Sequence, residues 1–393
     1  PDRPILVSAF TVGGYNMAKQ IIPEADAIIF FPLDLPFVAE SMVKRIHPGI
    51  FMPVETELWP NFLRAIRERH IPVMMVNGRI SEKSVKTYRY LYGIWDDMLS
   101  TVSRFCMQSS IDADYIYSLG ADKNKIFVTG NTKFDQTYAE VTPEDYARYK
   151  EELGLNDSYP IIMAGSTHPG EEKALFDAFK KVREKYADAR LVIAPRKTNR
   201  ADEISKLASS YGYETGYRSK MLENPNLRKK YPVVLLDTIG ELGRIYAVGD
   251  VVFVGGSLCK TGGHNVLEPA AHAKPIIVGP NMQNFKDSYS LLSKVGACKM
   301  VNNVAELANE MIDIIGNDER REKMGAASLQ VIKENRGADI RSIHYLKELL
   351  DLTSVPSREY ASYPINTRGI NDEGGGGLRH SDAIIQYIYQ IAY

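Results

Sequence analysis

Short, apolar, β-rich runs alternate with amphipathic helical stretches along most of this chain, and this alternation constrains the fold more than any other feature. The strands expected in a first series are Ile5–Ala9, Ala27–Phe31, Gly49–Pro53, Val73–Val76, Arg104–Met107 and Lys125–Thr129. Those of a second series are Pro160–Met163, Arg190–Ala194, Val233–Asp237, Asp250–Val254 and Pro275–Val278. Because helical stretches separate successive strands, the pattern predicts parallel sheets of the α/β class.

The two series are separated by Gln136–Ser158, a charged, turn-rich stretch without a strand signal. Helices are expected on both sides of it, at Pro36–Ile46, Asn61–Arg69, Gly170–Tyr186 and Ile239–Val248. A length of 393 residues allows about two or three domains of the usual size. We therefore predict two doubly wound domains facing across a cleft, 1–145 and 146–337, with a further helix at 338–352 that ends the helical pattern begun at Leu307. In such sheets the ligand lies beyond the carboxyl ends of the strands.

The last part of the chain, 353–393, has a different character. It contains a polar stretch with four consecutive glycines, followed by a second helical pattern with Ser381 as a candidate N-cap. A helix placed here would restore the β-α-β rhythm if it packed beside Ile5–Ala9. The segment is therefore expected to complete the first domain, either through a circular permutation or as a natural extension.

Charge and cysteine content exclude several classes of function. The chain has 48 Lys and Arg residues against 49 Asp and Glu residues, so it lacks the basic surplus of a nucleic-acid-binding protein. Cys106, Cys259 and Cys298 are too few and too scattered for a disulfide framework or a cysteine metal site. No apolar run reaches about 18 residues and no signal peptide is recognisable, which predicts a cytoplasmic protein.

The strongest local motif is the glycine-rich stretch at 251–280. An expected strand runs into Gly255-Gly256-Ser257, and a second pair, Gly262-Gly263, is expected to open a helix at His264-Asn265. Glycines let the backbone approach an anion, and a helix N-terminus offers unpaired N–H groups. Glu268 is placed to reach a sugar hydroxyl. The alternative is a turn that serves only the chain path.

Two further loops follow expected strands of the second domain. Ser166, Thr167 and His168 precede a helix and are candidates for phosphate or sugar contacts, whereas Glu171 and Glu172 are explained as favourable partners of the helix dipole. Arg196 and Lys197 follow the next strand and could hold a phosphate. In isolation, ordinary helix capping explains the first loop and a solvated basic loop explains the second.

Polar side chains also follow two expected strands of the first domain. Glu55 and Glu57 are two residues apart, so an extended backbone would place both on one face, where they could orient a sugar or act as a general base. Asn77 and Arg79 follow the next strand in a similar arrangement. Aromatic residues within Tyr88–Leu99 could face acyl chains or a bilayer, but a domain core is the favoured explanation.

Taken together, these motifs closely resemble one family. They are ETELWPN (55–61), NGRISEKS (77–84), GNTKFD (130–135), AGSTHPGEE (164–172), PRK (195–197), GELGRIYAVGDVVFVGGSL (240–258), GGHNVLEPA (262–270) and GPNMQNF (279–285). In this order they resemble the 3-deoxy-D-manno-octulosonic acid (Kdo) transferases, the lipid A glycosyltransferases of Gram-negative bacteria. The resemblance implies a GT-B fold of two Rossmann-like domains, CMP-Kdo as donor, a lipid A precursor (lipid IVA) as acceptor, and inversion without a metal or cofactor. It also implies a peripheral position at the cytoplasmic face of the inner membrane.

The resemblance assigns roles to individual residues. It places Gly262, Gly263, His264 and Asn265 around the CMP phosphate, Glu268 on the nucleotide sugar, and Asn284 at the edge of the cleft. It places Ser166, Thr167, His168 and Arg196 on phosphate or Kdo groups. The family more often has histidine where this chain has Lys197. Glu55 and Glu57 would face the acceptor or the Kdo, and Arg79, beside Asn77, would position them.

The general base is the largest departure from the family pattern. The family carries it in a Ser-x-Gly-Glu turn that precedes the segment matching Pro1 onward. The glutamate in the tail nearest a helix start is Glu373, with Asp382 as a rival. Two alternative functions stay open: an inactive relative that binds CMP-Kdo, and a nucleotide-sugar 2-epimerase of the same architecture, against which the ETELWPN motif argues.

Overall fold

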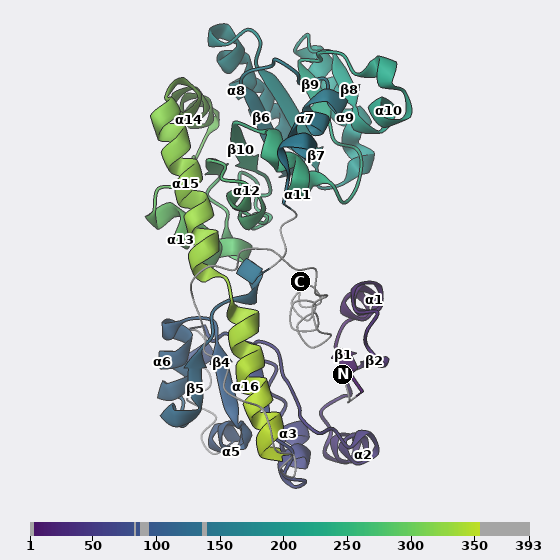
Figure 1. The fold of residues 1–393 in the computed structure, drawn as a ribbon, viewed down its shortest axis with the longest axis vertical. Coiled ribbons are helices and arrows are strands. Elements are labelled where there is room, and N and C mark those ends of the chain that lie inside the picture. Colours follow the sequence, from purple (N-terminus) through teal and green to yellow (C-terminus); the bar gives the residue numbers. More distant parts are fainter. Residues whose placement is uncertain (1–3, 82–83, 87–93, 136–139, 354–393) are drawn as a thin grey trace. The chain divides into compact units, whose positions relative to one another are not determined.

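The computed structural model describes residues 4–81, 84–86, 94–135 and 140–353. The chain forms two compact units, unit 1 (1–136 and 335–393) and unit 2 (137–334) (Figure 1). The expected tail helix, Glu373 and Asp382 lie outside the described residues. Both units are of the α/β class with parallel strand pairing, which confirms the fold class expected from the alternation of strands and helices.

Unit 2 is built on a seven-stranded sheet in the order β12-β11-β10-β6-β7-β9-β8, and every pairing is parallel. The strands are β6 (Ile161–Thr167), β7 (Arg190–Pro195), β8 (Thr215–Tyr217), β9 (Val233–Leu235), β10 (Val251–Val254), β11 (Ile276–Val278) and β12 (Cys298–Met300). The edge strands β8 and β12, three residues each, were not expected, because such short runs carry no clear periodicity. The central strands β6 and β10 are neighbours, so the loops that follow them emerge side by side.

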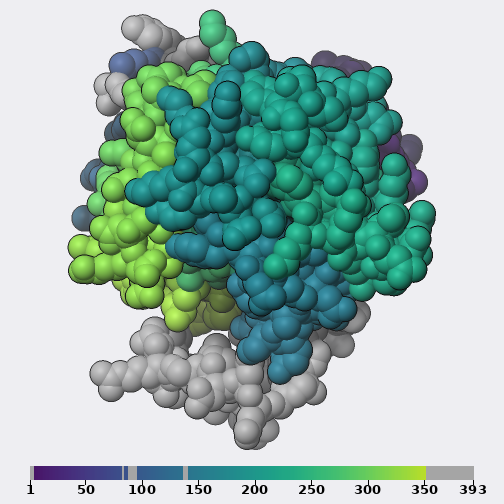
Figure 2. Space-filling model, turned by 90° about the horizontal axis from the view of Figure 1, so that it is seen from above, coloured from purple at the N-terminus to yellow at the C-terminus, as the bar shows by residue number. Residues whose placement is uncertain are grey.

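Helices cover both faces of this sheet. On one face α8 (Glu171–Lys185), α9 (Ala201–Ser210) and α14 (Val304–Gly316) bury a continuous apolar core. The space-filling view shows the yellow-green of α14 adjoining the teal of α8, in agreement with the packing of these two helices (Figure 2). On the other face, Tyr246 is fully buried against Gly165 of β6, where any Cβ would overlap the tyrosine ring.

The other helices of unit 2 are α7 (Pro143–Glu152), α10 (Arg218–Glu223), α11 (Leu242–Ile245), α12 (Leu267–Ala271), α13 (Lys286–Lys294) and α15 (Asp318–Asn335, which ends at the unit boundary). The single helix expected at Ile239–Val248 is instead the short α11 followed by a 3₁₀ turn. The helix expected to open at His264-Asn265 begins only at Leu267.

Unit 1 contains two small parallel sheets. β1 (Leu6–Ala9) pairs with β2 (Ala27–Phe30), and β3 (Met74–Gly78), β4 (Arg104–Met107) and β5 (Ile126–Val128) form the second sheet. Its helices are α1 (Val12–Ile21), α2 (Pro36–Ile46), α3 (Pro60–Arg67), α5 (Ile94–Thr101), α6 (Ser110–Ser118) and α16 (Ala338–Thr353). In place of the strand expected at Gly49–Pro53, Phe51 and Val54 form isolated bridges to Val73 and Val76, because Pro53 between them has no N–H to donate to a ladder.

The helical pattern that began at Leu307 is divided between the units. Gly337 adopts a positive φ of 92° and separates α15 from α16. Ile343 and Leu349 of α16 are buried against Met74 and Val76 of β3, so α16 belongs to unit 1 and does not end the second series. In Figure 1, α16 lies along the small sheet of this unit.

Trp95, Met98 and Leu99 are buried in the core of unit 1, which agrees with the domain-core interpretation of the aromatic segment Tyr88–Leu99. Residues 87–93 of that segment lie outside the described residues. Within the described ranges, no helix combines the length and apolar character needed to cross a membrane. The same ranges contain no grouping of three or more His, Cys, Asp or Glu side chains suited to a metal ion.

Candidate functional site

Two loops of unit 2 meet where β6 and β10 end. The N–H of Gly255 donates to the carbonyl of Gly165 across 2.8 Å, which extends the pairing of the two strands into the loops. A Cβ on Gly255 would lie 2.5 Å from the backbone oxygen of Ser166. Only glycine therefore permits this approach, and it brings the Ser166–His168 segment beside the glycine-rich stretch.

The first glycine pair is filled by a side chain of the protein itself. Glu171 accepts hydrogen bonds from the N–H groups of Gly256, Ser257 and Leu258, at 2.8, 3.0 and 2.9 Å, and from that of His168 at 2.9 Å. Glu171 is only 2% exposed to solvent. A carboxylate of the chain therefore already occupies the amides of the first glycine pair.

The second glycine pair forms a turn with several unpaired amides. Gly262 and Gly263 have φ values of 95° and 78°, a region that favours glycine. The N–H of Gly263 donates to the Gly256 carbonyl, and the N–H of Asn284 donates to the Gly262 carbonyl. Among the described residues, no acceptor pairs with the N–H groups of Gly262, His264 or Asn265. Since α12 is only five residues long, the capacity to bind an anion rests on these amides and not on a helix dipole.

A histidine pair joins the two loops. The Nε2 atoms of His168 and His264 are 2.8 Å apart, and the rings are stacked with an interplanar angle of 9°. Burial, the charge of Arg196 and the neighbouring His168 lower the pKa of His264 to about 4. His264 is therefore neutral near pH 7, so one ring nitrogen donates and the other accepts.

Glu268 lies under the same turn and contacts Asn265. The Asn265 side-chain amide donates to Glu268 across 3.2 Å, and its oxygen accepts the N–H of Leu267 across 3.0 Å. Burial raises the pKa of Glu268, and the Asn265 hydrogen bond and the charge of Arg196 oppose that rise. The exposed Arg196 side chain thus acts electrostatically on both His264 and Glu268. Lys197 is exposed beside it.

Thr167 differs from its neighbours in the loop after β6. Its hydroxyl is buried and donates to Glu172 across 2.9 Å, and Glu172 in turn pairs with Arg200 across 2.7 Å. The hydroxyl therefore serves the packing of α8 and is not presented to a ligand. Ser166 is half-buried with a φ of 56°. Asn284 is exposed, and its side-chain amide donates to the carbonyl of Thr261 across 3.0 Å.

The two glutamates of unit 1 are not on one extended face. Glu55 has a left-handed φ of 57° and lies in a turn, so the alternation assumed for a strand does not apply. Glu55 is half-buried, whereas Glu57 is exposed and accepts from Trp59 Nε1 across 3.1 Å. Trp59 also stacks on Phe10, with ring centroids 5.4 Å apart. The pair therefore flanks an aromatic cluster but does not form a carboxylate dyad by extended geometry.

Asn77 and Arg79 occupy different environments. Asn77 is 2% exposed with a φ of 53°, and its oxygen accepts from the N–H of Thr132 across 3.2 Å. Its Nδ2 finds no partner in the described part of the chain. Arg79 is half-buried, and its carbonyl accepts from the Thr56 hydroxyl across 2.7 Å. These contacts tie the loop after β3 to the ETELWPN turn.

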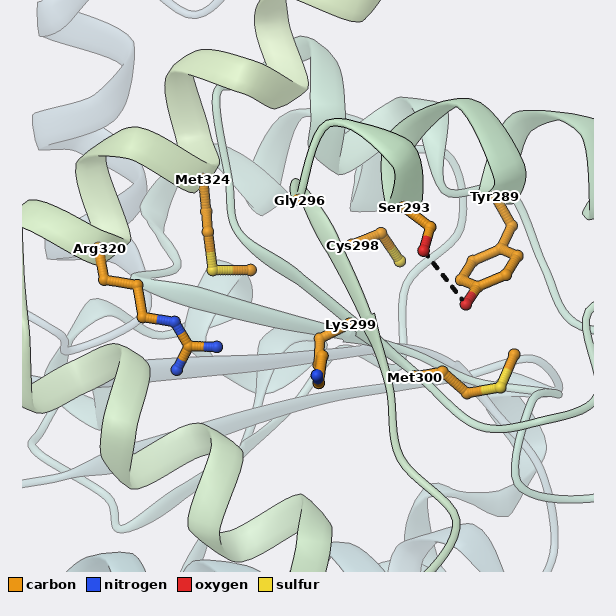
Figure 3. A pocket seen from close by; sticks show the side chains of 8 residues that line it. All are labelled: Tyr289, Ser293, Gly296, Cys298, Lys299, Met300, Arg320 and Met324. Carbon is orange, nitrogen blue, oxygen red and sulfur yellow. Dashed lines mark hydrogen bonds between the residues drawn. The ribbon is translucent and has the colours of Figure 1, made fainter.

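A cavity of about 350 Å³ opens elsewhere in unit 2, between α13, β12 and α15 (Figure 3). Lys299, Arg320 and Met324 lie on one side of the cavity in this view, and Met300 lies on the side of Tyr289. The hydroxyl of Ser293 donates to that of Tyr289 across 3.4 Å. Arg320 is already paired with Glu310 and Asp313. The cavity shares no lining residue with the two loops, so it is separate from the expected donor site.

Comparison with known proteins identifies the family to which these loops belong. Residues 1–136 match the family model described as 3-deoxy-D-manno-octulosonic-acid transferase (Kdo transferase). Over 355 residues the chain is 32% identical to the 3-deoxy-D-manno-octulosonic acid transferase of Haemophilus influenzae, and the match covers 89% of this chain and 81% of that protein. The chain belongs to the Kdo transferase family.

Other relatives agree with this assignment. The Kdo transferase of Bordetella pertussis is 28% identical over 324 residues, which cover 82% of this chain and 74% of that protein. The crystal structure of UDP-GlcNAc 2-epimerase from Neisseria meningitidis bound to UDP-GlcNAc has a TM-score of 0.58 at 14% identity, covering 88% of this chain and 91% of that one. The epimerase likeness shows the fold alone. The resemblance read from the motifs, the GT-B class of fold and the glycosyltransferase assignment are confirmed.

Among the residues of this Kdo transferase family member, Glu171 was missed as part of the site. The sequence shows it only as an acidic residue in the first turn of a helix, for which the dipole is a sufficient explanation. Its partners lie 85 to 87 residues further along the chain, and no local pattern reveals that distance. A signal that could have prompted the idea is a run of glycines whose backbone amides need an acceptor once they are buried.

Proposed function

We propose that this chain transfers Kdo from CMP-Kdo to a lipid A precursor such as lipid IVA, with inversion at the anomeric carbon and release of CMP. The observation that carries the proposal is the turn at Gly262–Asn265, where unpaired amides, the neutral His264 and the charge of Arg196 converge. That arrangement suits a single phosphate ester, which is what a CMP-linked sugar presents. We propose Kdo as the transferred sugar because the relatives are named Kdo transferases.

Binding of the donor is assigned to unit 2. The amides of Gly262, His264 and Asn265 would hold the phosphate, and Arg196 would neutralise its charge. Glu268, held by Asn265, would accept hydrogen bonds from hydroxyls of the nucleotide ribose. His168, which contacts His264, and Asn284, whose N–H donates to Gly262, border the same turn, and we assign Ser166 to the donor site with them.

The reaction breaks the bond between the anomeric carbon and the phosphate oxygen. As that bond opens, the sugar takes on oxocarbenium character and negative charge collects on the departing phosphate. Arg196 and the loop amides would stabilise that charge as it develops on the phosphate. An acceptor hydroxyl attacks the opposite face of the sugar, and a carboxylate removes its proton.

The carboxylate base remains a hypothesis. Glu373 is our candidate, by analogy with the position of the family's base before a helix, and Glu55 and Glu57 are the acceptor-side carboxylates among the described residues. Glu373→Gln should abolish acceptor-dependent CMP release if Glu373 is the base. Release at the wild-type rate would move the base to another carboxylate and leave the transferase proposal intact.

The donor assignment is tested with Arg196→Ala. We expect turnover to fall by about 100-fold or more, the usual effect of removing one group that stabilises the developing charge. Lys229→Ala is the matched control, since Lys229 is an exposed cation of unit 2 whose partner is Glu214. Equal activity of both variants would contradict the site.

The alternative is a relative that binds CMP-Kdo without transferring it. CMP binding together with a complete lack of acceptor-dependent release would favour it. We further propose that the protein acts at the cytoplasmic face of the inner membrane, where a lipid acceptor is accessible; a flotation assay with lipid vesicles tests this.

A further inference from the structure

We propose that Glu171 is a positioning residue for the donor site: its buried carboxylate acts as an internal anion that holds the glycine-rich loop in its binding conformation. This inference deepens the proposed function, and its affinity test rests on that function. The carboxylate uses both oxygens. Oε1 accepts from Ser257 and Leu258, and Oε2 accepts from Gly256 and His168.

This bonding pattern differs from ordinary helix capping. Glu171 is the first residue of α8, yet three of its four amide donors belong to the loop after β10 and only one to its own loop. Bonds to a carboxylate are stronger than bonds between neutral groups, and burial strengthens them further. One side chain therefore fastens together two loops that the sheet only brings near each other.

A single peptide group connects Glu171 to the proposed phosphate site. In the peptide group between Gly256 and Ser257, the Ser257 N–H donates to Glu171, and the Gly256 carbonyl accepts from the N–H of Gly263 and the hydroxyl of Thr261. A Cβ on Gly256 would lie 2.8 Å from Cδ2 of His264. Any rotation of that peptide would therefore move Gly263 and His264, which belong to the proposed donor turn.

The same geometry determines where a ligand phosphate can bind. With Glu171 in place, the amides of 256–258 are occupied by negative charge, and a ligand anion is excluded from them. The amides of the second turn stay available. Glu171 thus orients the turn at Gly262–Asn265 and also keeps the amides of 256–258 from competing for the phosphate.

Glu171→Gln tests this role, and Glu172→Gln is its matched control. Glu172 is the next residue of α8 and is equally buried, at 1% exposure, but it pairs with Arg200 and Thr167 and not with the glycine-rich loop. In the unliganded protein, we expect faster hydrogen–deuterium exchange of the amides in 255–264 for Glu171→Gln only. CMP affinity, measured by calorimetry, should fall by about 10- to 100-fold in that variant, the range for losing one bond to a charged group.

Glu171→Ala adds a readout that a purely structural role would not move. Formate is a carboxylate small enough to replace the missing group, so it should partly restore CMP affinity to Glu171→Ala and leave Glu172→Gln unchanged. If Glu171→Ala does not fold, Glu171→Gln still decides the question. Wild-type exchange over 255–264 and wild-type CMP affinity in Glu171→Gln would overturn the inference. If the wild type binds no CMP, the proposed function fails, while the exchange comparison still tests the positioning role.

Discussion

Gly262→Ala tests the conformation of the donor turn, and Gly212→Ala provides a comparison in the same unit. Gly262 has a φ of 95° and Gly212 a φ of 81°, so alanine is strained at both positions. That strain costs about 1–2 kcal/mol for a non-glycine residue. At Gly262 the added Cβ would also lie 2.5 Å from Asn284 Nδ2, whereas nothing lies within 4 Å at Gly212.

The additional loss of unfolding free energy in Gly262→Ala comes from displacing the Asn284 side chain. Because Asn284 is exposed, its side chain can move aside, and the additional cost is its hydrogen bond to Thr261, about 0.5–1.5 kcal/mol. Gly262→Ala should therefore lose about 1.5–3.5 kcal/mol and Gly212→Ala about 1–2 kcal/mol. Moving Asn284 should also shift the amides proposed to hold the phosphate. Urea unfolding measures the first effect and CMP titration the second. Equal loss of stability in both variants, with unchanged CMP affinity, would refute the reasoning.

Three further predictions concern buried charges. Arg200→Ala leaves Glu172 buried without its cation and should lower the unfolding free energy of unit 2 by about 3–5 kcal/mol in urea titrations; a loss under 1 kcal/mol would contradict this. Burial and the nearby Asp339 raise the pKa of Asp135 to about 6, so the stabilising contribution of Asp135 is complete below about pH 4 and is lost as the pH rises through 6. Asp135→Asn should flatten this part of the curve of unfolding free energy against pH for unit 1. An unchanged slope in the variant would contradict the prediction. The lowered pKa of His264 makes stability depend on pH in the opposite direction. The free energy of unfolding of unit 2 should fall as the pH drops from about 6.5 toward 4, and His264→Gln should remove that loss.

The alternation of strands and helices was sufficient to predict the parallel sheets, because packing a buried strand against amphipathic helices leaves few other arrangements. The central strands β6, β7 and β10 fall within a few residues of their expected positions. The edge strand β12, with only three residues and one exposed position, gives no comparable pattern. The unit against which α16 packs also could not be predicted, since its apolar residues would suit the core of either unit.

Prediction of the site from the sequence has its best structural support at the donor turn, whose role in binding stays a prediction. The positive φ values of Gly262 and Gly263 and the charge of Arg196 near His264 agree with the expected anion-binding turn. It failed for Glu55 because an extended backbone was assumed where the chain turns. It also failed for Thr167, whose hydroxyl is committed to Glu172 inside the protein. In each failure the deciding partner or backbone conformation is a property of the folded chain and not of the local sequence.

The central claim is transfer of Kdo, and CMP release from CMP-Kdo with and without lipid IVA in detergent tests it most directly. We predict that the intact chain releases CMP only when lipid IVA is present, with an equal amount of Kdo appearing on the lipid. CMP binding with no acceptor-dependent release, or release that is the same without the lipid, would contradict the account.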